Sequence, residues 1–203
     1  MIDLSHLSYE DNISGTIQVV KYAHKKGVTV EAELGVIKGV EDNQSSDSSY
    51  FTDPHLALDF INKTKVDSLA VSIGTAHGIN KGTKTPNIRY DILKSLEEII
   101  PKDFPLVCHG ASSVNNTLTT EYINSGGILN KAQGISLDDL HKMATTTPIS
   151  KINIDTDLRL VFTTAMRETL NQNPEIFDPR KHFKFVIDKL IKQIIKTSTE
   201  VLK

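Results

Sequence analysis

The feature that most constrains the fold is a regular alternation of short apolar segments with helical ones. Strand-like runs rich in apolar residues occur at 28–35, 67–74, 105–110 and 151–156. Helices are expected before, between and after them, at 17–26, 53–64, 91–100, 115–124, 136–144, 157–171 and 180–200. Asp53 and Ser136 are typical N-cap residues for two of these helices. This alternation predicts an α/β fold in which helices cover a parallel sheet.

The pattern is compatible with two architectures, an open doubly wound sheet and a barrel. The glycine-rich G-x-G-x-x-G phosphate fingerprint that opens a dinucleotide-binding fold is missing. Residues 1–3 are typical of the tail of a strand, and residues 36–52, rich in Gly, Asp and Ser, are expected to form a loop. In a barrel, chemistry gathers at the carboxyl ends of several strands.

Composition excludes several classes of function. The chain has 203 residues, enough for a sizeable core, and a net charge of −2, which gives no field to attract nucleic acid or an anionic membrane. Its one cysteine, Cys108, excludes an intramolecular disulfide and fits a reducing compartment. There is no membrane-length apolar run, and the opening "MIDLSHLSYED" is unlike a signal peptide. We therefore expect a cytoplasmic protein with no nucleic-acid or membrane partner.

Polar side chains stand at or near the expected strand ends. They are Asp3, Glu33, His77, His109, Asn153 and Asp155. His77 and His109 are each followed by glycine, which lets the backbone approach a bound group. A lone histidine is as often a hydrogen-bonded rim residue, but two beside Glu33 predict a zinc site, since neutral imidazoles suit zinc.

Three other histidines, on helices, are expected to take no part in this site, and His6 is left open. His24, His141 and His182 fall on helices and are predicted to be solvated, whereas His6 lies just past the first strand end. The loops that follow His77 and His109 also carry phosphate-binding groups. These are Gly78, Lys81, Gly110 and Ser112, which supply backbone N–H groups, a cation and a hydroxyl.

Four strand-end motifs, "EAELG", "SIGTAHG", "PLVCHGAS" and "KINIDTDLR", closely resemble the class II, zinc-dependent fructose-bisphosphate aldolases in order and spacing. The resemblance runs from residue 1 to about residue 190. It implies an incomplete TIM (β/α)8 barrel in which residues 1–203 are the C-terminal portion of a single domain, roughly strands 4 to 8. The family's third zinc histidine and its acid/base aspartate lie in an "H-L-D-H"-like segment at the end of the third strand, outside this chain.

The resemblance also implies roles for individual residues. His77 and His109 match zinc ligands, and Glu33 and Asp3 match carboxylates that hold or orient the metal. Gly78, Lys81, Gly110 and Ser112 match the site of the ketose C1 phosphate, where a monovalent cation also binds. The substrate-contacting segment after the last strand is matched by Asn153, Asp155 and Thr156. Arg159 matches an arginine that reaches the other phosphate across a dimer interface. Glu41 matches a residue of an acidic mobile loop that helps to move protons.

The reaction implied is the zinc-dependent cleavage of fructose 1,6-bisphosphate to dihydroxyacetone phosphate and glyceraldehyde 3-phosphate, in glycolysis or gluconeogenesis. The resemblance also implies a homodimer or larger homo-oligomer. Asp155 and Asp157 favour fructose 1,6-bisphosphate, because tagatose-bisphosphate aldolases tend to have Ala and Glu there. Two alternatives stay open: a tagatose-bisphosphate aldolase, and a non-catalytic fragment. Residues 1–203 alone are expected to be inactive.

Overall fold

A parallel sheet forms the centre of the protein, which is described from a computed structural model that covers residues 1–41, 44–46, 51–79, 86–130 and 132–203. The strand order is β1 (Glu31–Leu34), β4 (Ser68–Val71), β6 (Leu106–Cys108) and β7 (Ile149–Ile152). Each neighbouring pair is parallel. The predicted α/β class with a parallel sheet is therefore confirmed.

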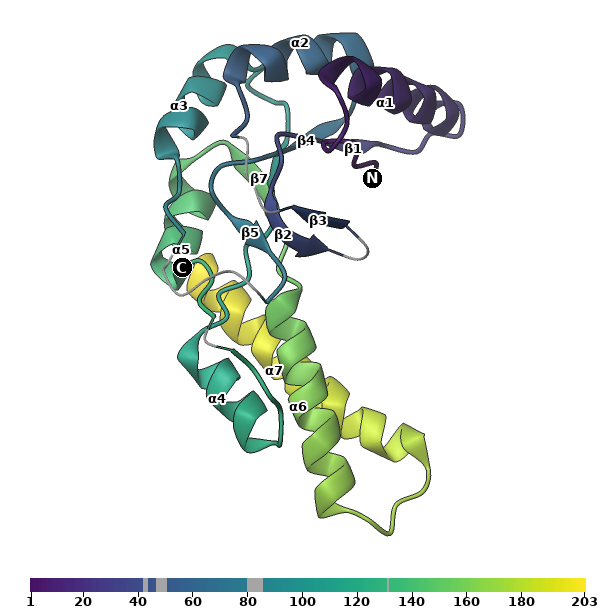
Figure 1. Ribbon diagram of the computed structural model, residues 1–203, viewed down its shortest axis with the longest axis vertical. Coiled ribbons are helices and arrows are strands. Elements are labelled where there is room, and N and C mark those ends of the chain that lie inside the picture. Colours follow the sequence, from purple (N-terminus) through teal and green to yellow (C-terminus); the bar gives the residue numbers. More distant parts are fainter. Residues whose placement is uncertain (42–43, 47–50, 80–85, 131) are drawn as a thin grey trace.

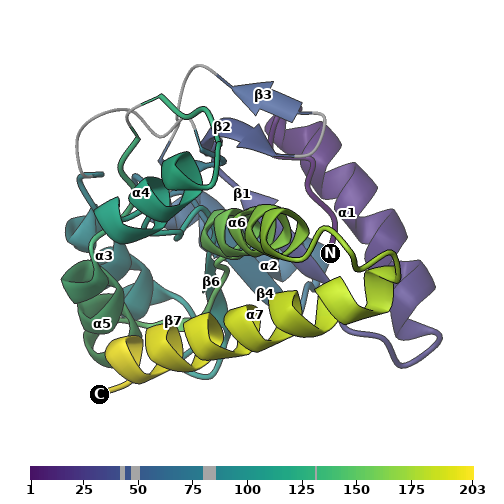
Figure 2. The same cartoon turned by 90° about the horizontal axis from the view of Figure 1, so that it is seen from below.

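Helices alternate with the strands along the chain, and several of them cover the sheet (Figure 1). They are α1 (Tyr9–His24), α2 (Pro54–Thr64), α3 (Tyr90–Ile99), α4 (Asn116–Asn124), α5 (Leu137–Thr146), α6 (Thr156–Gln172) and α7 (Pro179–Val201). In both views α6 and α7 lie side by side, and in Figure 1 this pair extends well away from the sheet (Figures 1 and 2). No helix in the described ranges combines the length and apolar character needed to span a bilayer.

The core lies between the sheet and the inner faces of the helices. Phe60 of α2, Leu69 of β4, Leu96 of α3 and Leu106 of β6 are all fully or almost fully buried in one cluster. Their burial explains why short β-branched and apolar segments fold as inner strands: each removes apolar surface from water on both faces of the sheet.

The first helix is longer than the sequence pattern predicts, because it begins at Tyr9 rather than near residue 17. Ser8 is its N-cap, and the Ser8 hydroxyl oxygen accepts a hydrogen bond from the Asp11 N–H at 3.2 Å. The expected N-caps Asp53 and Ser136 are confirmed, with side chains that accept hydrogen bonds from the first turns of α2 and α5.

Two other boundaries differ from expectation. The predicted loop 36–52 contains β2 (Lys38–Glu41) and β3 (Gln44–Ser46), which form a second small sheet with β5 (Ala76–His77) in the order β3-β2-β5. The last strand of the main sheet is residues 149–152 rather than 151–156. Near the chain start, Ile2 forms a parallel bridge with Ala32, which confirms the strand-tail prediction for residues 1–3.

Candidate metal centre

Glu33 and His109 meet because their strands are parallel and end at the same edge of the sheet. β4 lies between β1 and β6, with Glu33 paired to Ala70 and Ala70 paired to Val107. Asn12 of α1, itself buried, donates a hydrogen bond from its side chain to the Glu33 carbonyl oxygen at 3.0 Å. The end of β1 is thereby fixed in place.

His77 reaches the same edge through the small sheet, where β5 pairs with β2. Its ring lies 5.9 Å from the His109 ring between centroids, in an edge-to-face arrangement. Glu33, His77 and His109 each offer one ligand atom, and the three atoms lie within 4.8 Å of one another. The prediction that the two strand-end histidines meet is confirmed. Two imidazoles and a carboxylate fit a divalent cation such as zinc.

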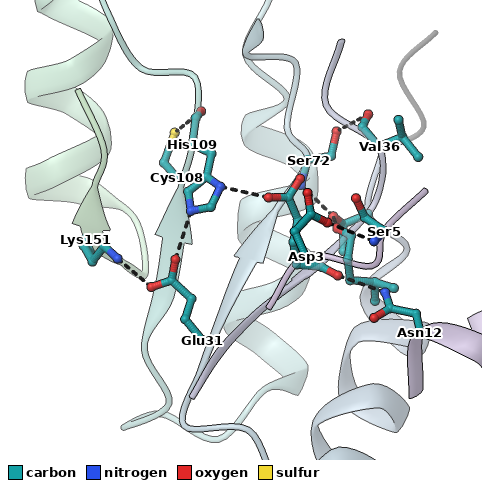
Figure 3. Close-up of polar contacts among 12 residues, drawn as sticks. Asp3, Ser5, Asn12, Glu31, Val36, Ser72, Cys108, His109 and Lys151 are labelled. Carbon is teal, nitrogen blue, oxygen red and sulfur yellow. Dashed lines mark hydrogen bonds and ion pairs between the residues drawn. The ribbon is translucent and has the colours of Figure 1, made fainter. Parts of the chain in front are cut away.

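His109 is held on both sides by carboxylates. Its Nδ1 lies 2.8 Å from Glu33 Oε2, and its Nε2 lies 2.9 Å from Glu31 Oε1. Figure 3 shows Glu31 between His109 and Lys151, whose Nζ donates to the second Glu31 oxygen at 2.6 Å. Strand-end motifs alone do not single out Glu31, although Glu31 and Glu33 share one face of β1 by the two-residue period of a strand.

These contacts shift the pKa values of all three groups. Burial acts to lower the pKa of His109, but hydrogen bonds to Glu31 and Glu33 raise it to about 9. Burial raises the pKa of Glu33, with a further rise from the negative charge of Asp3. Burial acts to raise the pKa of Glu31 as well, but hydrogen bonds to His109 and Lys151 bring it below its ordinary value. A proton on His109 therefore competes with any metal for the ring nitrogen that faces Glu33.

The two glycine loops expected to bind phosphate touch each other. Gly78 and Gly110 both have positive φ, at 70° and 65°. A Cβ on Gly110 would lie 2.7 Å from the Ala76 carbonyl oxygen, so glycine is what allows the loop after β6 to pack against β5. Lys81 lies outside the described residues.

The segment after β7 joins the same edge. The Asn153 N–H donates to the Cys108 carbonyl at 2.9 Å, and the Asp155 N–H donates to the Ser112 hydroxyl at 3.2 Å. Thr156 opens α6, and Arg159, one turn later, forms an ion pair with Asp155 at 2.7 Å. Both side chains of this pair are largely exposed, so water screens it and other groups can displace it.

Of two further carboxylates predicted for the site, Asp3 and Glu41, the structure describes the side chain of Asp3 alone. Asp3 lies outside the three-residue group and accepts a hydrogen bond from the Ser5 N–H at 2.9 Å (Figure 3). Its influence on the Glu33 pKa nevertheless places it nearby. Glu41 ends β2, and its side chain falls outside the described part of the protein.

The expectation that His24, His141 and His182 are all solvated is wrong for His182. His182 is buried between α6 and α7, within hydrogen-bond distance of the Thr169 hydroxyl and the Ile176 carbonyl. His141 is half-buried and lies 3.1 Å from the Val201 carbonyl oxygen. His24 is exposed, as predicted, and pairs with Asp67.

Comparisons with known proteins identify the family of the chain. A family model described as "Fructose-bisphosphate aldolase class-II" matches residues 1–203. A fructose-bisphosphate aldolase from Thermus caldophilus is 43% identical, over 99% of this chain and 65% of its own length. One from Treponema pallidum (strain Nichols) is 42% identical, over 100% of this chain and 64% of its own length. The chain thus spans slightly less than two thirds of these relatives.

Solved structures show the same fold. The YdjI aldolase from Escherichia coli K12 matches with a TM-score of 0.70 and 29% identity, covering 98% of this chain and 59% of its own. A fructose-bisphosphate aldolase from Campylobacter jejuni matches with a TM-score of 0.68 and 24% identity, covering 98% of this chain and 58% of its own. A match to about 60% of each neighbour is consistent with an incomplete TIM barrel. Since the family model covers the whole chain, the protein belongs to the class II fructose-bisphosphate aldolase family.

Proposed function

We propose that this chain supplies the C-terminal portion of a single barrel domain, and with it most of the active site, of a zinc-dependent fructose-bisphosphate aldolase. The observation that supports this best is the convergence of Glu33, His77 and His109 within 4.8 Å, at the sheet edge that also carries the Gly110 loop. A metal site beside a phosphate-binding loop suits a phosphorylated sugar with a carbonyl to polarise.

His109 is proposed to bind the metal through Nδ1, the nitrogen that faces Glu33, another member of the cluster. Glu31 then accepts the proton that stays on Nε2, which fixes the tautomer and the ring orientation. Zinc, when bound, supplies a Lewis acid that polarises the ketose carbonyl and stabilises the charge that develops when the C3–C4 bond breaks.

The loops around the metal are proposed to bind and orient the substrate. Gly78, Lys81, Gly110 and Ser112 bind the C1 phosphate, with a monovalent cation nearby. Asn153, Asp155 and Thr156 contact the sugar, and Glu41 assists with protons. Arg159 reaches the second phosphate from the partner subunit of a homodimer, for which it must leave its own Asp155. The group that takes the proton of the C4 hydroxyl is expected outside residues 1–203.

The preference for fructose over tagatose 1,6-bisphosphate is proposed to rest on Asp155 rather than Asp157. Asp155 has a largely exposed side chain at the edge of the site, whereas Asp157 is buried against the loop at Ser113. Of the two, the exposed Asp155 is therefore the one proposed to contact a substrate directly. A comparison of the two bisphosphates on Asp155→Ala tests this, and an unchanged preference would remove Asp155 from the proposal.

The function is tested with the chain joined to the N-terminal third of a longer relative, assayed for triose phosphate release from fructose 1,6-bisphosphate. We expect zinc-dependent turnover that falls at least about 100-fold in His77→Ala, because a catalytic zinc needs its protein ligands. His24→Ala, at an exposed histidine outside the cluster, is the matched control. Turnover that survives both a chelator and His77→Ala would refute the proposal. Glycolysis and a cytoplasmic location would follow from this activity.

A further inference from the structure

The first turn of α6 carries a buried carboxylate that the proposed mechanism does not use. Asp157 is 2% exposed. Its Oδ2 accepts hydrogen bonds from the Ser113 N–H at 2.8 Å and the Ser113 hydroxyl at 3.0 Å, and its Oδ1 accepts one from the Val114 N–H at 2.8 Å. Both oxygens are thus occupied by the loop that follows β6.

The backbone of this loop is strained at the point where Asp157 binds it. Val114 has φ of 44°, a left-handed conformation that is unfavourable for a β-branched residue. Such a conformation persists only where the surroundings enforce it. Two contacts hold Val114 in this conformation: the hydrogen bond from its N–H to Asp157, and the burial of its side chain in a cluster with Leu118 and Leu160.

The neighbouring residues of the loop are fixed by backbone contacts. The Gly134 N–H donates to the Ser113 carbonyl at 2.9 Å, and the Ile135 N–H donates to the Ser112 carbonyl at 3.3 Å. A Cβ on Gly134 would collide with the Ser112 carbonyl oxygen, so this approach requires glycine. The Ser112 hydroxyl accepts from the Asp155 N–H. Residues 110–114 are therefore held by α6, by residues 134–135 and by the end of β7.

We infer that Asp157 is a positioning residue, which holds residues 110–114 in the conformation that binds the phosphate of the substrate. This inference rests on the proposed function. A carboxylate beside an anion site would by itself repel phosphate, but here its charge is directed at two backbone N–H groups and a hydroxyl, so it fixes the loop instead. Asp157 connects residues 44 positions apart, and so couples the phosphate loop to the start of α6.

The test compares Asp157→Asn with the unaltered 203-residue chain, using inorganic phosphate as the probe. Asn has the size of Asp, but its NH2 group would face an N–H donor of the loop. Phosphate is titrated while the backbone amide signals of Gly110 and Ser112 are followed by NMR, and zinc affinity is measured separately. We expect phosphate affinity to fall at least about 10-fold and zinc affinity to change less than about twofold. Asp138→Asn, at an exposed carboxylate in the first turn of α5, is the control and should change neither.

A second variant distinguishes positioning from general stabilisation. Glycine adopts positive φ without strain, so in a Val114→Gly background Asp157→Asn should weaken phosphate binding clearly less than it does alone. An equal loss in both backgrounds would overturn the inference, as would unchanged phosphate binding in Asp157→Asn. Where Asp157→Asn does not fold, Ser113→Ala decides: it removes one of the three hydrogen bonds, and phosphate binding equal to that of the unaltered chain would overturn the inference.

The outcomes separate this inference from the proposed function. If the unaltered chain binds phosphate but Asp157→Asn binds it equally well, the positioning role alone is wrong. If the unaltered chain gives no shift at Gly110 or Ser112, the phosphate site of the proposed function and the inference both fail. The zinc measurement reports on Glu33, His77 and His109 independently of either result.

Discussion

Glu31→Gln should change zinc affinity in a way that depends on pH, because Glu31 acts on His109 by two opposing routes. With metal bound, Glu31 accepts the remaining His109 N–H and orients the ring. Without metal, Glu31 and Glu33 together raise the pKa of His109 to about 9, so a proton competes with the metal. The substitution weakens the orienting contact, but it also weakens the competing proton.

The cost of weakening the orienting contact follows from the hydrogen bonds that Glu31 makes. Glu31 uses one oxygen on His109 and the other on Lys151, whereas glutamine has a single acceptor oxygen for both. A hydrogen bond to a charged group contributes about 1.5–3 kcal/mol and a neutral one about 0.5–1.5 kcal/mol. The side chains of His109 and Glu31 are only 3% and 10% exposed, so water screens the difference little. A loss of about 1.4 kcal/mol, or roughly tenfold in zinc affinity, is expected where no proton competes.

At lower pH the substitution acts on zinc affinity in the opposite direction, through the competing proton. Below pH 9 the unaltered chain must release a proton from His109 to bind zinc, so its affinity falls about tenfold per pH unit from pH 9 to pH 7. Glu31→Gln lowers the pKa of His109, so proton competition reduces the zinc affinity of this variant less. The tenfold disadvantage at pH 9.5 should therefore shrink, or reverse, at pH 7.

Zinc affinity is measured with a competing chelator at several pH values between 7 and 9.5, and the His109 pKa is measured by NMR on the metal-free chain. Glu97→Gln, at an exposed carboxylate on α3, serves as the control and should match the unaltered chain throughout. Equal affinity of Glu31→Gln and the unaltered chain at pH 9.5, or a disadvantage that grows as the pH falls, would refute the reasoning.

Three further predictions test stability and assembly. The metal-free chain should lose stability as the pH rises from 6.5 through about 9, because the folded state holds the His109 proton more tightly than the unfolded state does. This stabilisation is fully present below pH 6.5, the ordinary pKa of an unfolded histidine, and is lost as the pH passes 9. A Tm that is constant or rises across this range would contradict the prediction. Asp53→Ala should lower the free energy of unfolding, measured by urea denaturation, by about 1 kcal/mol, since Asp53 caps α2 through the His55 and Leu56 N–H groups. The control Asp103→Ala, at an exposed carboxylate, should have little effect. In the completed enzyme Arg159→Ala should weaken bisphosphate affinity without changing zinc affinity, and unchanged bisphosphate binding, or full activity of a monomer, would exclude the cross-subunit role.

The parallel sheet and the core of the metal cluster could be predicted because both depend on local patterns. Alternating apolar and helical segments imply parallel strands, and parallel strands bring their carboxyl ends to one edge. Residues placed directly after those ends, such as His109, or among the last residues of a strand, such as Glu33, must then lie close together. His77, six residues past the end of β4, also lies there, but through a pairing of β5 with β2, a strand within the segment that the sequence predicts to be a loop.

The residues that surround the cluster could not be predicted, because their partners lie far away in the chain. Lys151 contacts Glu31 across 120 positions, and no local spacing relates them. The motif pattern relates Asp157 to substrate preference, and only the tertiary structure directs it to Ser113 and Val114. His182 follows two basic residues and was expected to be solvated, but the pairing of α6 with α7 buries it.

Residues 1–203 expressed alone should show no appreciable aldolase activity. Within the described residues, the main sheet has β1 at one edge, extended only by the bridge at Ile2, and β7 at the other.

Beside β7 lies a groove of about 270 Å³, lined by β7 residues and by the end of α7, including Ile149, Ile152 and Val201. An apolar edge of this kind invites pairing with another strand. The resemblance places the base for the C4 hydroxyl outside these residues, and general acid–base catalysis is typically worth about 10²–10⁴-fold. Adding the N-terminal third of a longer relative should therefore restore activity. If instead the short chain, with zinc, released triose phosphate at a rate comparable to the long one, the open sheet would suffice for catalysis, and the assignment of the missing base would be wrong.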